Sequence, residues 1–174
     1  MQRSKLQFKI QNDKFILFLS LFILTLYFII SLYFLDKVYF LCPIEYKGDI
    51  VIRSDGRGGG RFGAERSGRR LHQGLDLFAK VDTPVLAGRS GRVAVARHAK
   101  GMGNFVVIKH PQNMITIYGH LSKINVVKNQ FVRQGDAIGA VGKTGNANYR
   151  DIQPHLHFEI RKNGVPQDPL KYLD

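Results

Sequence analysis

The sequence is poor in residues that several common kinds of site require. Its 174 residues include one cysteine, no tryptophan, and 13 acidic residues against 26 Lys and Arg. A single thiol builds neither a disulfide framework nor a finger-type zinc site, so any metal must take nitrogen and oxygen ligands. The only glutamates are Glu45, Glu65 and Glu159, and the HExxH motif is absent. The length excludes a large multidomain enzyme and allows one modest domain.

The shortage of acidic residues leaves a formal net charge of +13. From Lys37 onward, 22 basic and 11 acidic residues give +11, which favours anionic partners. Without tryptophan or a clustered aromatic and basic surface, we expect no nucleic acid partner. Anionic envelope polymers or lipid headgroups suit this charge better, and plain surface solvation is the alternative.

One long apolar run stands near the N-terminus. Residues 15–35 are 21 positions without a charge, long enough to span a bilayer. A cleaved signal peptide has a shorter apolar region followed by small residues, which are missing here. We therefore predict a single transmembrane anchor over 15–35. The basic residues of the segment 1–14 favour a cytoplasmic tail there.

The rest of the chain predicts a linker over 36–49 and an all-β domain over 50–174. Short β-branched runs alternate with Gly, Pro or Asn, and no helical apolar period is sustained. This pattern favours antiparallel sheets in a sandwich-like arrangement. The strands expected are Ile50–Arg53, Leu75–Ala79, Pro84–Ala87, Gly91–His98, Asn104–Lys109, Met114–Gly119, Ala137–Val141 and His155–Arg161.

Histidines occur in three short motifs: HQGLD from His72 to Asp76, YGH ending at His120, and HLHFE from His155 to Glu159. Side chains alternate along a strand, so the two histidines of HLHFE would face one side. They either share a cleft or lie on a solvated strand face. Glu159 would share that face, where it either orients an imidazole or lies in solvent.

The HQGLD motif requires a bend before it can form a site. A fully extended path would separate the Cα atoms of His72 and Asp76 by roughly 13 Å, so a bend at Gly74 is needed. Given this bend, a histidine, a carboxylate and a second histidine from a distant strand supply three ligands and leave a position for water, as in catalytic zinc sites. We expect His98 and His110 to be ordinary surface residues.

Basic and glycine-rich residues precede this motif. Residues 53–63, RSDGRGGGRFG, lack the Walker lysine pattern, and we interpret them as a flexible rim of a substrate groove. Arg66, Arg69 and Arg70 either hold substrate carboxylates or are surface charge. No substrate-binding residue follows from the sequence itself.

The stretch from about Arg53 to Asp174 resembles the lysostaphin and LytM-type zinc metallopeptidases, which cut peptide cross-links of bacterial peptidoglycan. The resemblance runs in order through RFGAERSGRRLHQGLDL, TPVLAGRSGRV, GNFVVIKH, TIYGHLS, VRQGDAIGAVGKTGN, PHLHFEI and DPLKYL. It implies that His72, Asp76 and His157 ligate Zn²⁺ while His120 and His155 handle protons. His155 would be the general base. His120 would orient the water or stabilise the oxyanion.

The same resemblance implies where the protein works. Peptidoglycan lies outside the cytoplasm, so we expect a single-pass inner-membrane protein whose catalytic domain faces the periplasm or the exterior. No separate wall-binding module follows the domain, which favours a Gram-negative periplasm over a Gram-positive wall.

Two alternatives stay open. One is a zinc-free protein of the same fold that binds cell wall or activates another hydrolase, although such proteins lose ligands and all five positions are intact here. The other is a swinging-arm carrier, because VRQGDAIGAVGKTG is similar to lipoyl and biotinyl hairpins with Lys143 in the turn. A carrier would not need the histidines.

Overall fold

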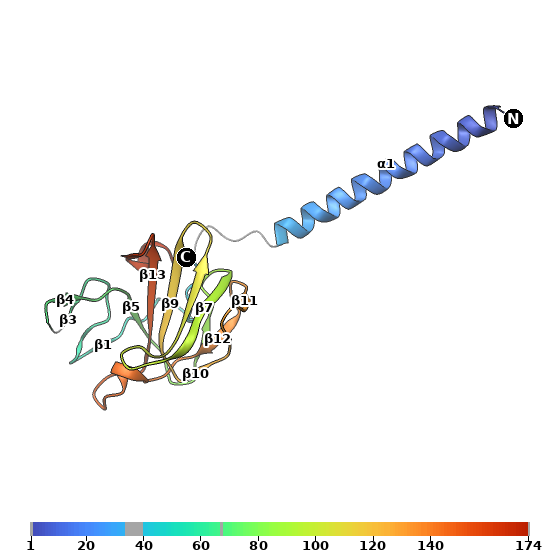
Figure 1. The fold of residues 1–174 in the computed structure, drawn as a ribbon. Coiled ribbons are helices and arrows are strands. Elements are labelled where there is room, and N and C mark those ends of the chain that lie inside the picture. Colours follow the sequence, from blue (N-terminus) through green and yellow to red (C-terminus); the bar gives the residue numbers. More distant parts are fainter. Residues whose placement is uncertain (1, 34–39, 67, 174) are drawn as a thin grey trace. The chain divides into compact units, whose positions relative to one another are not determined.

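The computed structural model describes residues 2–33, 40–66 and 68–173. Residues 1–36 and 37–174 form separate compact units, each considered by itself. The first unit contains one helix, α1 (Gln2–Tyr33; Figure 1). The predicted anchor over 15–35 is helical as far as Tyr33, and its last two residues lie outside the described residues. The tail predicted over 1–14 belongs to α1 from Gln2 onward.

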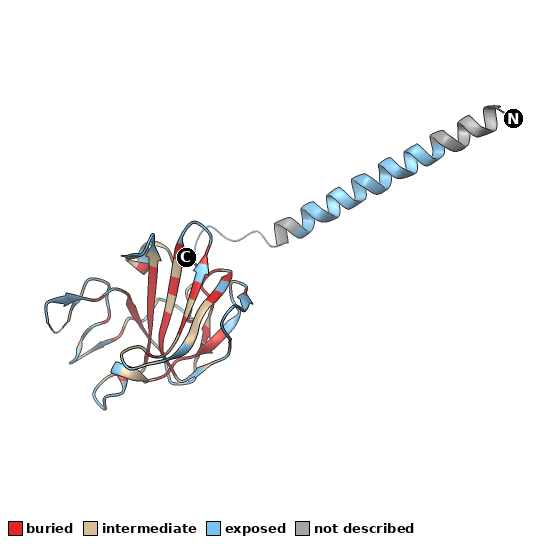
Figure 2. Ribbon diagram, viewed as in Figure 1, coloured by how far each residue is buried: buried red, intermediate tan, exposed pale blue. Residues whose placement is uncertain are grey.

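The part of α1 from Gln11 to Ile30 is long and apolar enough to cross a membrane. Its side chains are exposed along its whole length, as the pale blue ribbon in Figure 2 shows. A contiguous apolar surface of this size marks a site of membrane or protein interaction. Length and composition therefore suit either a membrane span or a signal sequence.

The second unit is an all-β domain. Its longer strands are β5 (Leu75–Phe78), β7 (Gly91–Ala99), β8 (Gly103–His110), β9 (Met114–Leu121), β12 (Ala137–Ala140) and β13 (His155–Lys162). Its short strands are β1 (Ser54–Asp55), β2 (Gly58–Gly59), β3 (Glu65–Arg66), β4 (Arg70–Leu71), β6 (Pro84–Leu86), β10 (Lys123–Ile124), β11 (Phe131–Val132) and β14 (Val165–Gln167). Two short 3₁₀ helices, η1 (Gly145–Ala147) and η2 (Pro169–Lys171), complete it.

The strands form one large and one small antiparallel sheet. The large sheet has the order β11-β7-β8-β9-β13-β14, and β5 pairs with β13 as well. The small sheet has the order β10-β12-β6, and β1 with β2 and β3 with β4 form two separate hairpins. The predicted antiparallel all-β architecture is confirmed. Of the predicted strands, Ile50–Arg53 is reduced to a single bridge between Ile52 and Leu77.

One hydrophobic core joins the two sheets. It contains Val85 and Ile138 from the small sheet and Leu156, Phe158 and Ile160 from β13. Because side chains alternate along a strand, the odd-numbered residues of β13 face the opposite side of the large sheet. Three of them, His155, His157 and Glu159, are buried too, so β13 is buried on both faces as far as Ile160 (Figure 2). Packing on both faces holds β13 in place, so side chains on this strand can be positioned accurately.

Within the linker predicted over 36–49, residues 40–46 belong instead to the domain, whereas residues 47–49 are exposed. Phe40 and Ile44 are only 1% and 2% exposed and belong to the core. The Phe40 N–H donates to the Tyr172 carbonyl at 3.0 Å, and the Leu41 N–H donates to the Gly88 carbonyl at 2.8 Å. Apolar side chains in this segment enter the domain because burial stabilises them. Residues 36–39 lie outside the described residues.

Candidate metal centre

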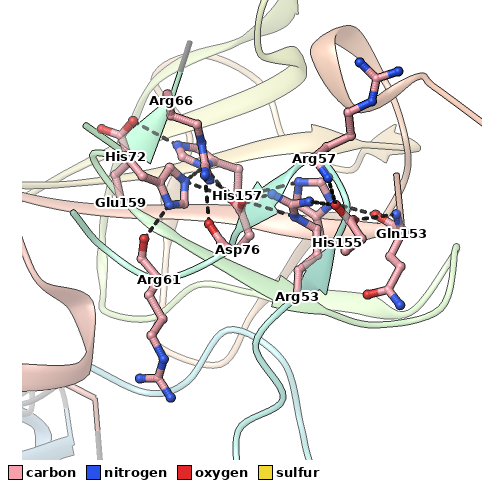
Figure 3. Close-up of polar contacts among 12 residues, drawn as sticks. Arg53, Arg57, Arg61, Arg66, His72, Asp76, Gln153, His155, His157 and Glu159 are labelled. Carbon is pink, nitrogen blue, oxygen red and sulfur yellow. Dashed lines mark hydrogen bonds and ion pairs between the residues drawn. The ribbon is translucent and has the colours of Figure 1, made fainter. Parts of the chain in front are cut away.

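The pairing of β13 with two neighbours assembles the site. His157 lies opposite Asp76 of β5 and opposite Gly119 of β9. His155 and His157 share a face, as their spacing predicts, and both line a cleft rather than a solvated strand surface. Figure 3 shows both side chains with Asp76. Side chains from distant parts of the sequence therefore meet over β13.

The bend predicted at Gly74 is present and brings His72 to Asp76. A Cβ atom at position 74 would lie 2.5 Å from the Phe158 carbonyl oxygen and 2.9 Å from Cγ of Glu159. Only glycine allows the chain to pass this close to β13. As a result, Nε2 of His72 lies 3.0 Å from Oδ1 of Asp76, and the four-residue spacing works without a helix.

Three ligand atoms converge at this point: Nε2 of His72, Oδ1 of Asp76 and Nδ1 of His157. The two imidazole nitrogens are 3.0 Å apart, and Nδ1 of His157 is 2.8 Å from the carboxylate oxygen. Tetrahedral zinc with bonds of about 2.0–2.1 Å requires ligand atoms roughly 3.3 Å apart. The donors need to open by only a few tenths of an ångström, and all three residues are buried. The donor set fits zinc.

Both imidazoles of the cluster are fixed by an acceptor on their other nitrogen. Nδ1–H of His72 donates to the Arg61 carbonyl at 2.9 Å. Nε2–H of His157 donates to Oε1 of Glu159 at 3.0 Å, and Arg161 holds the second oxygen of Glu159 at 2.7 Å. Glu159 is therefore a buried orienting group and not a solvated one. Such partners fix the tautomer in which the free nitrogen faces the metal.

The carboxylate of Asp76 uses its two oxygens for different tasks. Oδ1 faces the imidazoles, while Oδ2 accepts hydrogen bonds from Arg53 at 3.1 and 3.3 Å and from Arg66 at 3.1 Å. Arg66 was predicted either to hold substrate carboxylates or to be surface charge. It is not plain surface charge, because it lines the cleft and is paired with Asp76. The arginines leave Oδ1 as the single oxygen for a metal.

The electrostatics of the cluster favour opposite charges on neighbouring residues. Burial alone would raise the pKa of Asp76, but hydrogen bonds from His157 and His72 hold it well below its usual range. Burial alone would lower the pKa of His157, but Asp76 and Glu159 raise it to about 9. A metal cation and a proton on Nδ1 therefore compete for the same place.

His120 reaches the cleft through an irregularity in β9 that the sequence does not reveal. Between Tyr118 and Leu121, β9 has one residue more than β8, which forms a bulge. His120 lies in the bulge with φ of +63°. This left-handed conformation is energetically unfavourable for a residue other than glycine. Without the bulge, His120 would share the core face of Tyr118. With it, the His120 and His155 rings are 5.0 Å apart.

His120 and His155 both present an unprotonated nitrogen to the cleft. Nδ1–H of His120 donates to the Thr144 carbonyl at 2.9 Å, and Nδ1–H of His155 donates to the Gln153 carbonyl at 2.7 Å. Burial and the neighbouring histidines lower the pKa of His120 to about 3. Burial also lowers the pKa of His155, although Asp76 opposes this change. Both pKa values lie below the usual range of histidine, so both rings are neutral at neutral pH.

A cleft of about 580 Å³ lies over these groups. Arg57 of the glycine-rich segment and Arg70 line it, whereas Arg69 does not. The flexibility expected of residues 53–63 does not hold at Gly60, which is buried and exchanges backbone hydrogen bonds of 2.8 and 2.9 Å with Asp76 and Arg53. The segment is a structural part of the site.

The remaining histidines lie outside the cleft, as predicted, but only His98 is exposed. His110 is 8% exposed and buried, which corrects the surface position predicted for it. Its Nδ1–H donates to the Ser90 carbonyl at 2.9 Å, and its Nε2 accepts from the Thr116 hydroxyl at 2.8 Å. Both ring nitrogens are used, so His110 stabilises the fold without offering a ligand atom.

Residues 70–169 match peptidase family M23, and the chain belongs to this family. The DD-carboxypeptidase/endopeptidase Mpg of Neisseria meningitidis is 42% identical over 101 residues, which cover 58% of this chain and 22% of that protein. In general, the chain spans about a fifth to two fifths of the length of the curated relatives it matches.

Solved structures show the same architecture. A zinc-containing peptidase from Vibrio cholerae superposes with a TM-score of 0.64 and 32% identity, covering 78% of this chain and 40% of that one. The catalytic domain of lysostaphin from Staphylococcus simulans gives a TM-score of 0.56 and 32% identity, covering 69% and 91%. The resemblance to lysostaphin and LytM-type peptidases is confirmed.

Proposed function

We propose that the protein is a zinc-dependent endopeptidase that hydrolyses peptide cross-links of bacterial peptidoglycan. The observation that carries this proposal is the convergence of Nε2 of His72, Oδ1 of Asp76 and Nδ1 of His157 beside two further neutral imidazoles in one cleft. Membership of family M23 and the likeness to a zinc-containing peptidase support the metal and the reaction class.

The three ligands would hold zinc and leave a fourth position open to the cleft. When bound, zinc supplies Lewis acidity, which polarises a peptide carbonyl and lowers the pKa of water toward roughly 7. Arg53 and Arg66 keep Asp76 ionised and turned toward the ion, and Glu159 keeps the ring of His157 in the ligating tautomer. These residues orient the donors before any substrate enters.

His155 is the proposed general base. Its Nδ1–H is held by the Gln153 carbonyl, so its Nε2 lone pair faces the ligand cluster, 3.9 Å from Oδ1 of Asp76. There it can accept a proton from attacking water and return it to the leaving amine. The nearby Asp76 carboxylate stabilises the imidazolium formed in between.

His120 is the proposed water-orienting residue. Because its Nδ1–H donates to the Thr144 carbonyl, its Nε2 accepts hydrogen bonds from the cleft. An acceptor can orient water, whereas stabilising an oxyanion requires a donor. The pKa of about 3 keeps Nε2 unprotonated, so the geometry supports the first of the two roles predicted for His120.

The test uses the full chain in detergent with purified peptidoglycan of different cross-link types. We expect the zinc-loaded protein to convert cross-linked muropeptide dimers into monomers, identified by mass analysis, and a chelator to stop the reaction. A protein that binds zinc stoichiometrically and releases no fragment from any substrate would contradict the proposal. It would favour a wall-binding or hydrolase-activating role.

We also propose that α1 anchors the protein with its N-terminus in the cytoplasm and the domain outside. The apolar stretch from Gln11 to Ile30 and the substrate's location support this orientation. Protease added to intact spheroplasts should digest the domain. Digestion only after lysis would reverse the topology and leave the enzyme without access to its substrate.

A further inference from the structure

Arg53 connects the metal-ligand carboxylate to a second acidic residue within the protein. It is 4% exposed, and its Nη2 and Nε groups donate to Oδ2 of Asp76 at 3.1 and 3.3 Å. Its Nη1 group donates to Oδ1 of Asp55 at 2.5 Å. The side chains of Asp76 and Asp55 are 4% and 8% exposed, so both ion pairs are shielded from water.

Asp55 continues the chain of contacts to the residue that orients His155. Its Oδ2 atom accepts the Gln153 backbone N–H at 3.1 Å. The carbonyl of the same residue, Gln153, accepts Nδ1–H of His155 at 2.7 Å. One peptide segment is thus held by Asp55 on one side and holds the imidazole on the other.

This connection matters because His155 begins β13. The residues before it, from Asn148 to Gln153, are largely exposed and contain no strand. An exposed loop fixes a side chain poorly unless something anchors its backbone. The carboxylate of Asp55, whose side chain is 8% exposed, supplies such an anchor two residues before the proposed base. The nearby pair of Arg57 with Asp151 is more than half exposed and contributes little.

The backbone of the same segment fixes the other end of the contact chain. The Arg53 N–H donates to the Asp76 carbonyl at 2.9 Å, and the Asp76 N–H donates to the Gly60 carbonyl at 2.8 Å. A Cβ atom at Gly60 would lie 2.8 Å from the Arg53 carbonyl oxygen and 3.0 Å from Cβ of Asp76. Arg53 and Gly60, the two ends of this segment, are therefore packed directly against Asp76.

We propose that Arg53 and Asp55 are positioning residues that fix the Asp76 carboxylate and the His155 imidazole relative to each other. The guanidinium fork bridges two acceptors at once, which a lysine ammonium on a flexible stem does not reproduce. Asp55 bridges a guanidinium and a backbone N–H through two different oxygens. The role in metal binding stands on the ligand cluster, and the role through His155 rests on the proposed function.

The test compares Arg53→Lys and Asp55→Asn with Asp151→Asn in the full chain. Arg53→Lys keeps the charge but loses the bridge. Asp55→Asn must turn its amide toward either Arg53 or the Gln153 N–H, which breaks one contact. Asp151→Asn is the matched control, because it removes an exposed carboxylate from the same region. Zinc affinity is measured by chelator competition, and the His155 ring by imidazole ¹H–¹⁵N spectra.

We expect Arg53→Lys to weaken zinc binding about 10- to 100-fold, the usual effect of losing a partner of a metal ligand. Asp55→Asn should change the Nδ1–H resonance of His155 and lower kcat by about tenfold or more with KM within about twofold. Asp151→Asn should stay within about twofold in every measurement. If Arg53→Lys fails to fold, Asp55→Asn, which keeps Arg53 on Asp76, decides the proposal.

Repeating the Asp55→Asn substitution in a His155→Ala variant distinguishes a positioning role from a general effect on stability. In a protein that already carries His155→Ala, Asp55→Asn should cause no further loss of turnover, because it acts through that imidazole. The proposal is overturned if Asp55→Asn lowers kcat equally in both backgrounds, or if zinc affinity and the His155 resonance match the wild type. Should the wild type bind zinc without cleaving peptidoglycan, the proposed function fails, while affinity and spectra still decide the positioning role.

Discussion

His157 and His110 are both 8% exposed, yet they differ in what their ring nitrogens contact. One nitrogen of His110 contacts the Ser90 carbonyl and the other contacts the Thr116 hydroxyl, and both are partners of the fold rather than metal ligands. One nitrogen of His157 is fixed by Glu159, and the other faces Asp76 and His72. Burial therefore does not distinguish a candidate metal ligand from a histidine that supports the fold. A second nitrogen directed at other potential ligands does.

The largest expected effect comes from removing a ligand. His72→Ala should abolish zinc retention, because two donors with an open cleft hold the ion far less tightly than three. Elemental analysis of the full chain checks this, with His98→Ala as a control from outside the cleft. Stoichiometric zinc in His72→Ala would remove that residue from the ligand set.

Next in size is the loss of a group that handles protons or water. His155→Ala and His120→Ala should keep zinc while turnover falls roughly 10²- to 10⁴-fold. We expect the larger loss for His155, the proposed general base, whose Nε2 faces the ligand cluster. Product release from peptidoglycan gives the rates, and elemental analysis gives the metal. Near-normal turnover in either variant would refute the role assigned to that residue.

A smaller effect is expected at the partner of a ligand. Glu159→Gln keeps an acceptor for Nε2–H of His157 but removes its charge, so zinc affinity should fall about 10- to 100-fold. The matched control is Glu65→Gln, because Glu65 is exposed on β3. Equal affinities in the two variants would show that the Glu159 contact does not orient the ligand.

The pH dependence of stability tests the same region without a metal. Although burial opposes it, Asp76 and Glu159 raise the pKa of His157 to about 9, above its unfolded value of roughly 6.5. This contribution is present below pH 6.5 and lost as pH rises toward 9. The chelated protein should melt roughly 5–10 °C lower at pH 9 than at pH 6.5. His157→Gln should flatten this trend, and an unchanged slope would contradict the shift.

The smallest effect is expected at His110. His110→Ala removes two hydrogen bonds and an edge contact with the Phe40 ring, at a cost of about 1–2 kcal/mol. Thermal unfolding measures this loss. The zinc content of the folded protein should not change. A loss of zinc in His110→Ala would contradict the conclusion that His110, unlike His157, supports only the fold.

The sequence predicts much of the site because its key spacings are local. Alternation along a strand places His155 and His157 on one face, and the spacing of His72 and Asp76 requires the bend at Gly74. The assignment of individual ligands required the family resemblance. Seven of the eight predicted strands appear with small shifts at their ends, because apolar runs between glycines mark them well.

What could not be predicted depends on contacts between distant residues. Asp55 accepts a hydrogen bond from the Gln153 N–H, 98 positions away in the sequence, and no local sequence pattern predicts this contact. The bulge at His120 exists only relative to β8, so β9 alone does not show it. His110 and Phe40 were misplaced for the same reason, because each becomes buried against the other rather than by its own neighbours in sequence.

The domain also begins and ends at one place. Phe40 forms a parallel bridge with Leu173, and its N–H donates to the Tyr172 carbonyl. A fold whose chain enters and leaves side by side can be inserted into a longer polypeptide without distorting its interior. A domain with adjacent ends can therefore occur within longer proteins. This arrangement accords with the fifth to two fifths of the curated relatives' length that this chain matches.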